Sequence, residues 1–425
     1  MLASQRELAG AAGWSLLAAV VARAANLLAL IICARLLTQA EFGQLGIIQS
    51  TVGMFAPLAS LGLAMSSTKF IAQYRETDRA RAGRILGLSL ATALVAGALL
   101  TVALIFVAPW IAERALSSPG LKHQLVAASG LLVLGVIESA EAGALAGLSA
   151  FSSLARAGAW SGAASIPVIA VLAWLNGASG AILGLTISLA LSCVMNGLAL
   201  REECRRFGIR ATLAGVSSEK DILFRFSLPA YVSGLLVAPV AWSANALLVQ
   251  GSQGFSQMAL FSAADRFRYL LIFVPLAVSR IAVPTLSRLH AAGDRPAYER
   301  TLHWNLLAGV SATAFPVLVC IAAAAPLISL FGPAFRPGWP VLALLALSAI
   351  PTVLNTQLGA AMLSEGRAWE RAGADAALAA ILLGLAWWTV PRWGAAGLAA
   401  SFAAAYSAAS FLLAILLWRG VRATS

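Results

Sequence analysis

The sequence predicts an all-α integral membrane protein of about twelve transmembrane helices, arranged in two six-helix lobes. Three observations lead to this prediction. Hydrophobic residues make up 60% of the 425 residues and charged residues only 11%, whereas soluble domains carry roughly 25% charged residues. Apolar runs long enough to cross a bilayer follow one another along the whole chain. The two halves of the chain also resemble each other.

The predicted spans are separated by short linkers. An α-helix rises about 1.5 Å per residue, so roughly 20 apolar residues cross a hydrocarbon core about 30 Å thick. The first apolar run is too long for the apolar part of a typical signal peptide, and we expect it to be a span. The predicted spans cover residues 12–34, 43–66, 85–108, 124–147, 157–174, 180–200, 226–249, 257–283, 304–330, 340–363, 372–390 and 395–418.

The basic residues predict the orientation of these spans. If the N-terminus is cytoplasmic, 20 of the 29 Lys and Arg residues fall in inside segments, five in outside loops and four within spans. Cytoplasmic loops of membrane proteins carry an excess of Lys and Arg. We therefore expect both termini to be cytoplasmic. The net charge of +12 is spread over short loops and forms no basic domain, so we expect no nucleic-acid partner.

An internal duplication predicts the lobes, which we place at residues 1–210 and 211–425. Two lobes of six spans each have the same topology and would be related by a pseudo-two-fold axis along the membrane normal. The matching segments keep their order along the chain. They pair Phe42–Gln44 with Phe255–Gln257 at an offset of 213, Leu148–Ser149 with Leu363–Ser364 and Arg156–Ala159 with Arg371–Ala374 at 215, and Gly177–Gly180 with Gly394–Gly397 at 217.

Several stretches carry a resemblance to a known family. They are Ala34–Thr38 with Glu41–Gly43, Ala259–Ala264 with Val283–Arg288, Phe331–Phe335 with Trp339 and Pro340, and Gly394–Gly397. Together with the span number and the duplication, they resemble the Wzx-type polysaccharide and O-antigen flippases of the multidrug/oligosaccharidyl-lipid/polysaccharide (MOP) exporter superfamily. The resemblance implies a transporter in the bacterial inner membrane. Its activity would be flipping of a polyprenyl-diphosphate-linked oligosaccharide by alternating access, for O-antigen or exopolysaccharide synthesis.

Arginines within the spans are the candidates for substrate binding, because a charge at the centre of a span costs about 2.5–3.5 kcal/mol on insertion scales. Arg23 lies in the middle of the first span, with Asn26 on the same helix face. A guanidinium suits a diphosphate, although an ion pair with a buried glutamate is the alternative. Arg266 and Arg268 lie beside Asp265. Asp265 and Arg268 can pair, so Arg266 ranks above Arg268 as a substrate contact.

Glu138 and Glu141 share one face of the fourth span, where two carboxylates would repel each other. They are candidates for proton or cation coupling, or they neutralise Arg23. The four cysteines and three histidines form no metal-binding pattern. We expect no catalytic residue, no metal and no cofactor.

Two other functions compete with the flippase prediction. The first is a cation-coupled exporter of drugs or small molecules from the same superfamily, which should have an acidic cavity. The second is a membrane glycan polymerase or ligase, which would need a larger outer loop than the one predicted at residues 109–123. The expected partners of the flippase are the polyprenyl-diphosphate-linked glycan and membrane lipids. Other polysaccharide-assembly proteins are further candidates.

Overall fold

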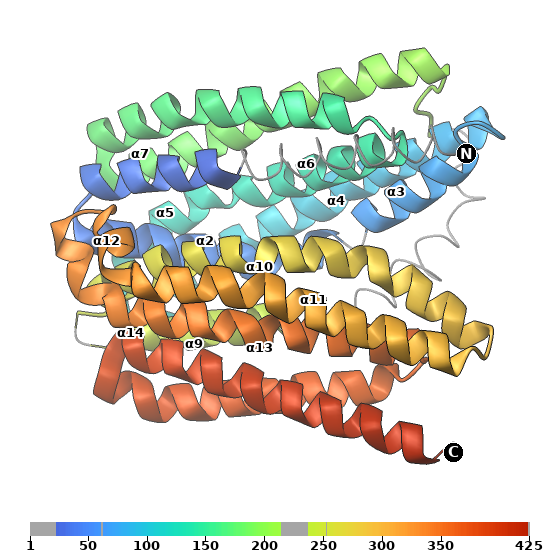
Figure 1. Cartoon of the computed structure of the whole chain (residues 1–425). Coiled ribbons are helices and arrows are strands. Elements are labelled where there is room, and N and C mark those ends of the chain that lie inside the picture. The colour runs from blue at the N-terminus through green and yellow to red at the C-terminus, as the bar shows by residue number, and fades with distance from the viewer. Residues whose placement is uncertain (1–22, 61–62, 214–236, 252, 424–425) are drawn as a thin grey trace. The chain divides into compact units, whose positions relative to one another are not determined.

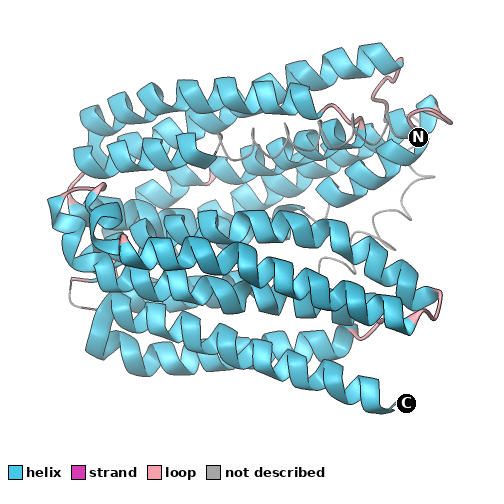
Figure 2. Cartoon of the chain, in the orientation of Figure 1, coloured by secondary structure: helices cyan, strands magenta, loops and turns pink. Residues whose placement is uncertain are grey.

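The computed structural model describes residues 23–60, 63–213, 237–251 and 253–423. These residues form α-helices joined by short turns and single helical turns, and they include no strand (Figure 2). The chain divides into two compact units, Met1–Ala238 and Pro239–Ser425. The predicted lobe boundary after residue 210 lies close to residues 214–236, which are outside the described residues, and it stays a prediction.

The first unit contains six helical passes (Figure 1). Residues 23–36 form the first pass, and the sixth is the second half of α7, which is interrupted at Asn176 and Gly177. Each pass overlaps one predicted span. The helices of this unit after residues 23–36 are α2 (Gln39–Ser60), α3 (Leu63–Tyr74), α4 (Arg79–Trp110), α5 (Lys122–Ala128), α6 (Gly130–Gly147) and α7 (Phe151–Phe207), with the short helices η1 (Ile111–Ala115) and η2 (Pro119–Leu121) after α4.

The second unit repeats this pattern (Figure 1). Its last helix is again a long one that holds two passes, interrupted at Gly394. The described part of the unit comprises α9 (Val237–Val249), α10 (Gly254–Ala291), α11 (Arg295–Ala322), α12 (Ala324–Ser329), the single turn η5 (Pro333–Gly338), α13 (Trp339–Ser364) and α14 (Ala368–Ala423).

Six helical stretches among the described residues are long and apolar enough to cross a membrane by themselves. Two of them, Phe151–Phe207 and Ala368–Arg419, have 57 and 52 residues, about twice the length that a single crossing needs. The interruptions at Gly177 and Gly394 divide each of them into two passes. The predicted fold class, an all-α membrane protein with twelve passes in two lobes, is confirmed.

The duplication is visible in the helix ends of the two units. Asp78 caps the N-terminus of α4, and its carboxylate accepts a hydrogen bond from the backbone N–H of Arg81 at 2.8 Å. Asp294 caps α11 in the same way, accepting from the N–H of Ala297 at 3.1 Å. An Asp at this position satisfies a backbone donor that the helix leaves free. An aspartate therefore caps the helix that forms the third pass of each unit.

The structure also fixes the register of the duplication. The helices α7 and α14 begin 217 residues apart, at Phe151 and Ala368, and their glycine interruptions are 217 residues apart as well. With this offset Arg156 corresponds to Gly373. The sequence match between Arg156 and Arg371, at 215, is therefore two residues out of register. In an alanine-rich chain, short identical segments match by chance at several offsets. The residue at which a helix is interrupted has only one position, so it gives the offset directly.

Each interruption lies against a polar side chain from the second helix of its own unit. A methyl group at Gly177 would lie 2.5 Å from Oε1 of Glu41, and Gly394 faces Gln257 in the same way. Glu41 also closes a capping box with Thr38, whose backbone N–H donates to it at 2.9 Å. Both glycines have a positive φ, 57° and 52°, which other residues adopt only with strain. By these contacts, Glu41 of the first unit corresponds to Gln257 of the second, at an offset of 216 residues.

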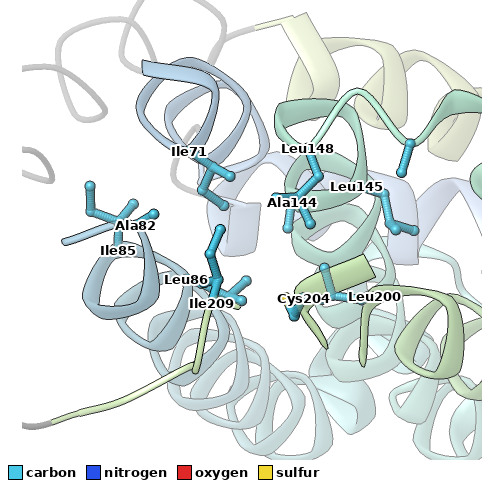
Figure 3. Close-up of a cluster of buried hydrophobic side chains, with 11 residues drawn as sticks. Ile71, Ala82, Ile85, Leu86, Ala144, Leu145, Leu148, Leu200, Cys204 and Ile209 are labelled. Carbon is cyan, nitrogen blue, oxygen red and sulfur yellow. The ribbon is translucent and has the colours of Figure 1, made fainter. Parts of the chain in front are cut away.

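The apolar core at one end of the first unit joins four helices (Figure 3). Ile71 of α3, Leu86 of α4, Leu145 of α6 and Leu200 of α7 are all at most 5% exposed. The segment that follows α7 runs along α4, and the backbone N–H of Thr212 donates to the carbonyl of Gly83 at 3.2 Å. A methyl group on α4 at this glycine would overlap the backbone of that segment.

Candidate substrate and coupling sites

A polar cavity of about 330 Å³ lies inside the first unit. Its walls come from the helix of residues 23–36, from α2 and α6, and from both halves of α7. Asn26, Gln49 and Glu138 contribute amide and carboxylate groups. The hydroxyl groups come from Ser161, Ser165, Ser188 and Ser192.

The serines reach the cavity because of their spacing. Residues four apart lie on one face of a helix, and the four serines form two such pairs, one on each half of α7. The two halves are joined by the hydroxyl of Ser192, which donates to Ser161 Oγ at 3.0 Å. Ser188 Oγ is buried and has no hydrogen-bond partner among the described residues. The cavity therefore offers a hydroxyl group that can bind a ligand.

Glu138 supplies the charge of this cavity. Its Oε1 accepts a hydrogen bond from the side-chain amide of Asn196, which is 2% exposed, at 3.4 Å. Glu141 lies one turn further along α6 and is 8% exposed, and its Oε2 has no partner within the described part of the chain. The described lining contains no basic side chain. Such a set of oxygen atoms suits a proton, a hard cation or hydroxyl groups, and it would repel a diphosphate.

Arg23 and Asn26 share a helix face in the sequence prediction, and the described lining of the cavity includes one of them. Asn26 lines the cavity with Glu138. Arg23, three residues earlier, is exposed and is not among the described residues that line the cavity. By its position in the cavity, Asn26 is therefore grouped with Glu138 rather than with Arg23. The roles of both residues, and of Glu141, stay predictions.

In the second unit, Arg268 is engaged in an internal ion pair. Its Nε donates to Oδ1 of Asp265 at 2.6 Å, and Arg268 is only 5% exposed. The guanidinium also lies over the ring of Phe402, 5.3 Å from the centroid. Arg266 is half-buried on the same helix. Asp265 thus engages the guanidinium of Arg268, and the ranking of Arg266 above Arg268 as a substrate contact stays a prediction.

Sequence reasoning missed a second buried polar cluster, at the junction of α13 and α14. Arg371 lies just outside the predicted span of residues 372–390, yet its side chain pairs with Asp375 at 2.7 Å. It also donates to the backbone carbonyl and the side-chain oxygen of Asn355, at 2.9 and 3.1 Å. Gly359 leaves room for the guanidinium, because a methyl group there would overlap it. Arg371 therefore neutralises an acid that is 3% exposed.

Comparison with known proteins adds the family. A family model described as "Polysaccharide biosynthesis protein" matches residues 8–290. The chain belongs to this polysaccharide biosynthesis family. The match covers the whole of the described first unit and the first two helices of the second, including the acidic cavity, Arg266 and Arg268.

One similar protein has a name that states its function. The EPS I polysaccharide export inner membrane protein EpsE of Ralstonia nicotianae is 23% identical over 189 residues, 44% of this chain. The match spans 43% of the length of that relative.

Solved structures with the same fold are transporters. A multidrug resistance MATE family transporter of the MOP superfamily, in an inward-facing conformation, matches with a TM-score of 0.76 and 16% identity over 94% of this chain and 93% of its own. A MOP superfamily transporter from Pyrococcus furiosus matches at 0.71 and 17%, over 96% and 93%. The lipid II flippase MurJ matches at 0.68 and 15%, over 95% and 87%. At these identities the likeness establishes the fold of this multi-pass membrane protein.

Sequence reasoning did not select the four serines of the cavity, nor Asn196, which donates to Glu138. Their signal was present, because Ser161 and Ser165, and then Ser188 and Ser192, lie four residues apart within apolar spans. A polar stripe at helical spacing inside a span indicates a face turned toward protein or water.

Proposed function

We propose that this protein moves a polyprenyl-diphosphate-linked oligosaccharide from the cytoplasmic to the outer leaflet of a bacterial inner membrane, by alternating access. The observation that carries the proposal is membership of a polysaccharide biosynthesis family by a chain with a transporter fold. The export protein of Ralstonia nicotianae and the lipid II flippase support it by their names and their likeness. The distribution of Lys and Arg supports a cytoplasmic location for both termini.

In this proposal the charged residues have two separate roles. Arg23 and Arg266 attract the diphosphate, since a planar guanidinium binds two phosphate oxygens at once. The prenyl chain stays in the lipid while the lobes alternate. The cavity with Glu138 takes up a proton or a monovalent cation, because its described lining combines a carboxylate with amide and hydroxyl oxygens and holds no basic group. Coupling would then occur inside the first lobe.

The same cavity favours a second candidate function, a cation-coupled exporter of small molecules. Acidic, oxygen-rich lining is what a cationic drug would require. In that case Glu138 would contact the substrate itself. The two functions differ in which variants abolish transport and with which substrate.

The test is translocation of a labelled polyprenyl-diphosphate oligosaccharide in proteoliposomes of the purified protein. We expect Arg23→Ala to abolish movement, Arg23→Lys to retain part of it, and Arg114→Ala, which removes an exposed arginine outside the spans, to leave it unchanged. Full transport by Arg23→Ala would refute the diphosphate contact. No movement by the wild type, under any imposed ion gradient, would favour the exporter.

A further inference from the structure

A second cavity, of about 790 Å³, lies in the second unit where α9 ends, α10 begins and α14 is interrupted. We call it the Trp–Gln cavity after its lining, which includes Gln250, Gln253, Gln257, Trp387, Arg392 and Trp393. Small-molecule pockets span roughly 300–1,000 Å³. The Trp–Gln cavity is therefore large enough for a ligand the size of a disaccharide, and the family prediction gives it no role.

The aromatic wall of this cavity is held in place. Trp393 packs edge-to-face against Trp388, with ring centroids 5.4 Å apart and planes at 87°. Arg392 lies over the other ring of this pair, 4.4 Å from the Trp388 centroid, and donates to the Trp388 carbonyl at 2.6 Å. These contacts restrict the movement of the Arg392 and Trp393 side chains in the lining of the cavity. Preorganisation of this kind lowers the entropy cost of binding.

The interruption of α14 adds a polar rim. At Gly394 the helical hydrogen-bond ladder breaks, and the backbone N–H of Ala395 donates to Oε1 of Gln257 at 2.9 Å. This contact fixes the oxygen of Gln257 and orients its NH₂ group. Gln250 and Gln253 also line the cavity. An amide both donates and accepts hydrogen bonds.

The duplication supplies an internal comparison. At the offset of 217, the first unit has Ala170, Val171, Leu175 and Asn176 where the second has Trp387, Trp388, Arg392 and Trp393. The first unit makes the same glycine interruption without these side chains. The turn itself therefore does not require them, and their presence in the second unit needs another explanation.

The lining identifies the chemistry of a ligand. Sugar hydroxyl groups donate and accept hydrogen bonds, as the glutamine amides do. The C–H face of a pyranose ring is apolar and packs on an aromatic face, and Trp387 and Trp393 are 73% and 55% exposed. The described lining contains one guanidinium and no carboxylate, so it favours a ligand with a negative charge. We propose that the Trp–Gln cavity is a binding site for an acidic sugar, one that carries a carboxylate.

The position of the cavity suits the outer side of the membrane. The opposite end of the same unit carries Arg288, Arg295, Arg300, Arg367 and Arg419, whereas this end carries Arg336 and Arg392. Under the positive-inside rule this end faces outward. The site would then receive the glycan after it has crossed, a step that rests on the proposed function; binding itself does not.

Interfacial anchoring is the competing explanation, because tryptophan is common at the level of the lipid headgroups. The first unit offers a matched control, since Trp174 lies at its corresponding turn and is 72% exposed. An anchoring role would make Trp174 and Trp393 equivalent. It would give no role to the fixed guanidinium or to the amides.

Binding is tested by saturation-transfer NMR on the purified full chain in detergent, with the glucuronic-acid disaccharide cellobiouronic acid and neutral cellobiose as probes. We expect the acidic disaccharide to bind more tightly. Trp393→Ala should weaken it about tenfold, and Trp174→Ala should leave it unchanged. Arg392→Gln should remove the preference for the acidic probe while keeping the fold, because Arg392 is exposed.

The outcomes separate the two proposals. Absence of binding of both probes to the wild type, or equal losses in Trp174→Ala and Trp393→Ala, would overturn the sugar site and leave an interfacial belt. If Trp393→Ala does not fold, Arg392→Gln alone decides, since an unchanged preference for the acid would overturn the site. A protein that binds the acidic probe as expected but moves no lipid-linked glycan would retain the site and lose the flippase.

Discussion

The buried ion pair between Arg371 and Asp375 gives the sharpest stability prediction. Asp375 is 3% exposed, and Arg371 holds it at 2.7 Å while also donating two hydrogen bonds to Asn355. Replacing Arg371 by leucine leaves a carboxylate buried without its cation. It also leaves the two oxygens of Asn355 without this donor. The predicted effect is therefore large.

The magnitude follows from the burial of the pair. Breaking a buried pair by removing one partner costs about 3–5 kcal/mol. The pair Arg295–Glu299 provides the control, because its side chains are 40% and 53% exposed at a distance of 3.4 Å. Exposed pairs contribute about 0–1 kcal/mol. The double variant Arg371→Leu/Asp375→Leu removes both charges and should recover most of the loss.

The assay uses the four cysteines, all of which are buried and unpaired. A thiol-reactive fluorescent dye labels them only as the protein unfolds, so heating in detergent gives an apparent melting temperature. We expect Arg371→Leu to melt well below the wild type, and Arg295→Leu and the double variant to melt close to it. Equal melting temperatures for Arg371→Leu and Arg295→Leu would refute the argument that Arg371 neutralises a buried acid.

Three further predictions concern other parts of the chain. Gly83→Leu should lower the melting temperature, because its side chain would overlap the backbone of the segment after α7; an unchanged value in the same dye assay would contradict that packing. Glu138→Gln should remove the dependence of transport on an imposed proton or cation gradient, whereas Glu113→Gln, in η1, should keep it; proteoliposome transport with and without a gradient decides. Ser188→Ala should weaken gradient-driven transport several-fold with little loss of stability, because its buried hydroxyl has no partner to lose among the described residues; undiminished transport would remove Ser188 from the site.

Much of the fold could be predicted from sequence because a bilayer imposes one requirement on every span. A run of apolar residues must satisfy its backbone internally and therefore forms a helix. The exact ends were less predictable. Helix α4 extends from Arg79 to Trp110, beyond the predicted span of 85–108, because a capping aspartate and charged residues continue the helix outside the apolar run.

The register of the duplication could not be read from identities alone. The matches at 213 and 215 lie in short segments of an alanine-rich chain, and the starts of α7 and α14 and their glycine interruptions give 217. Only the match of Gly177 with Gly394 has this offset, because a positive φ strongly favours glycine and fixes its position in the turn. Residues with a backbone requirement are thus the reliable markers of a repeat.

Contacts between helices were the least predictable feature. Sequence spacing places Arg23 and Asn26 on one face, but it does not show that Asn26 lines a cavity together with Glu138, which lies on a different helix. Likewise, the position of Arg371 near the end of a span indicates a loop. Its partner Asp375 lies four residues further along the same helix, whereas only the packing of α14 on α13 brings Arg371 to Asn355. Residue spacing predicts which side chains share a face of one helix, whereas a binding site is formed by side chains from several helices.

The two cavities lie at different places in their units and differ in the charge of their linings. The described lining of the first holds a carboxylate and no basic group, and that of the second holds a guanidinium and no carboxylate. One anionic glycan cannot bind both with similar affinity, because one of them repels it. The cavities are therefore not two copies of one substrate site. If the proposals hold, the first unit binds the coupling proton or cation and the second receives the sugar, so exchanging Glu138 for glutamine should leave binding of the acidic disaccharide unchanged. A loss of that binding in Glu138→Gln would show that the two sites depend on each other.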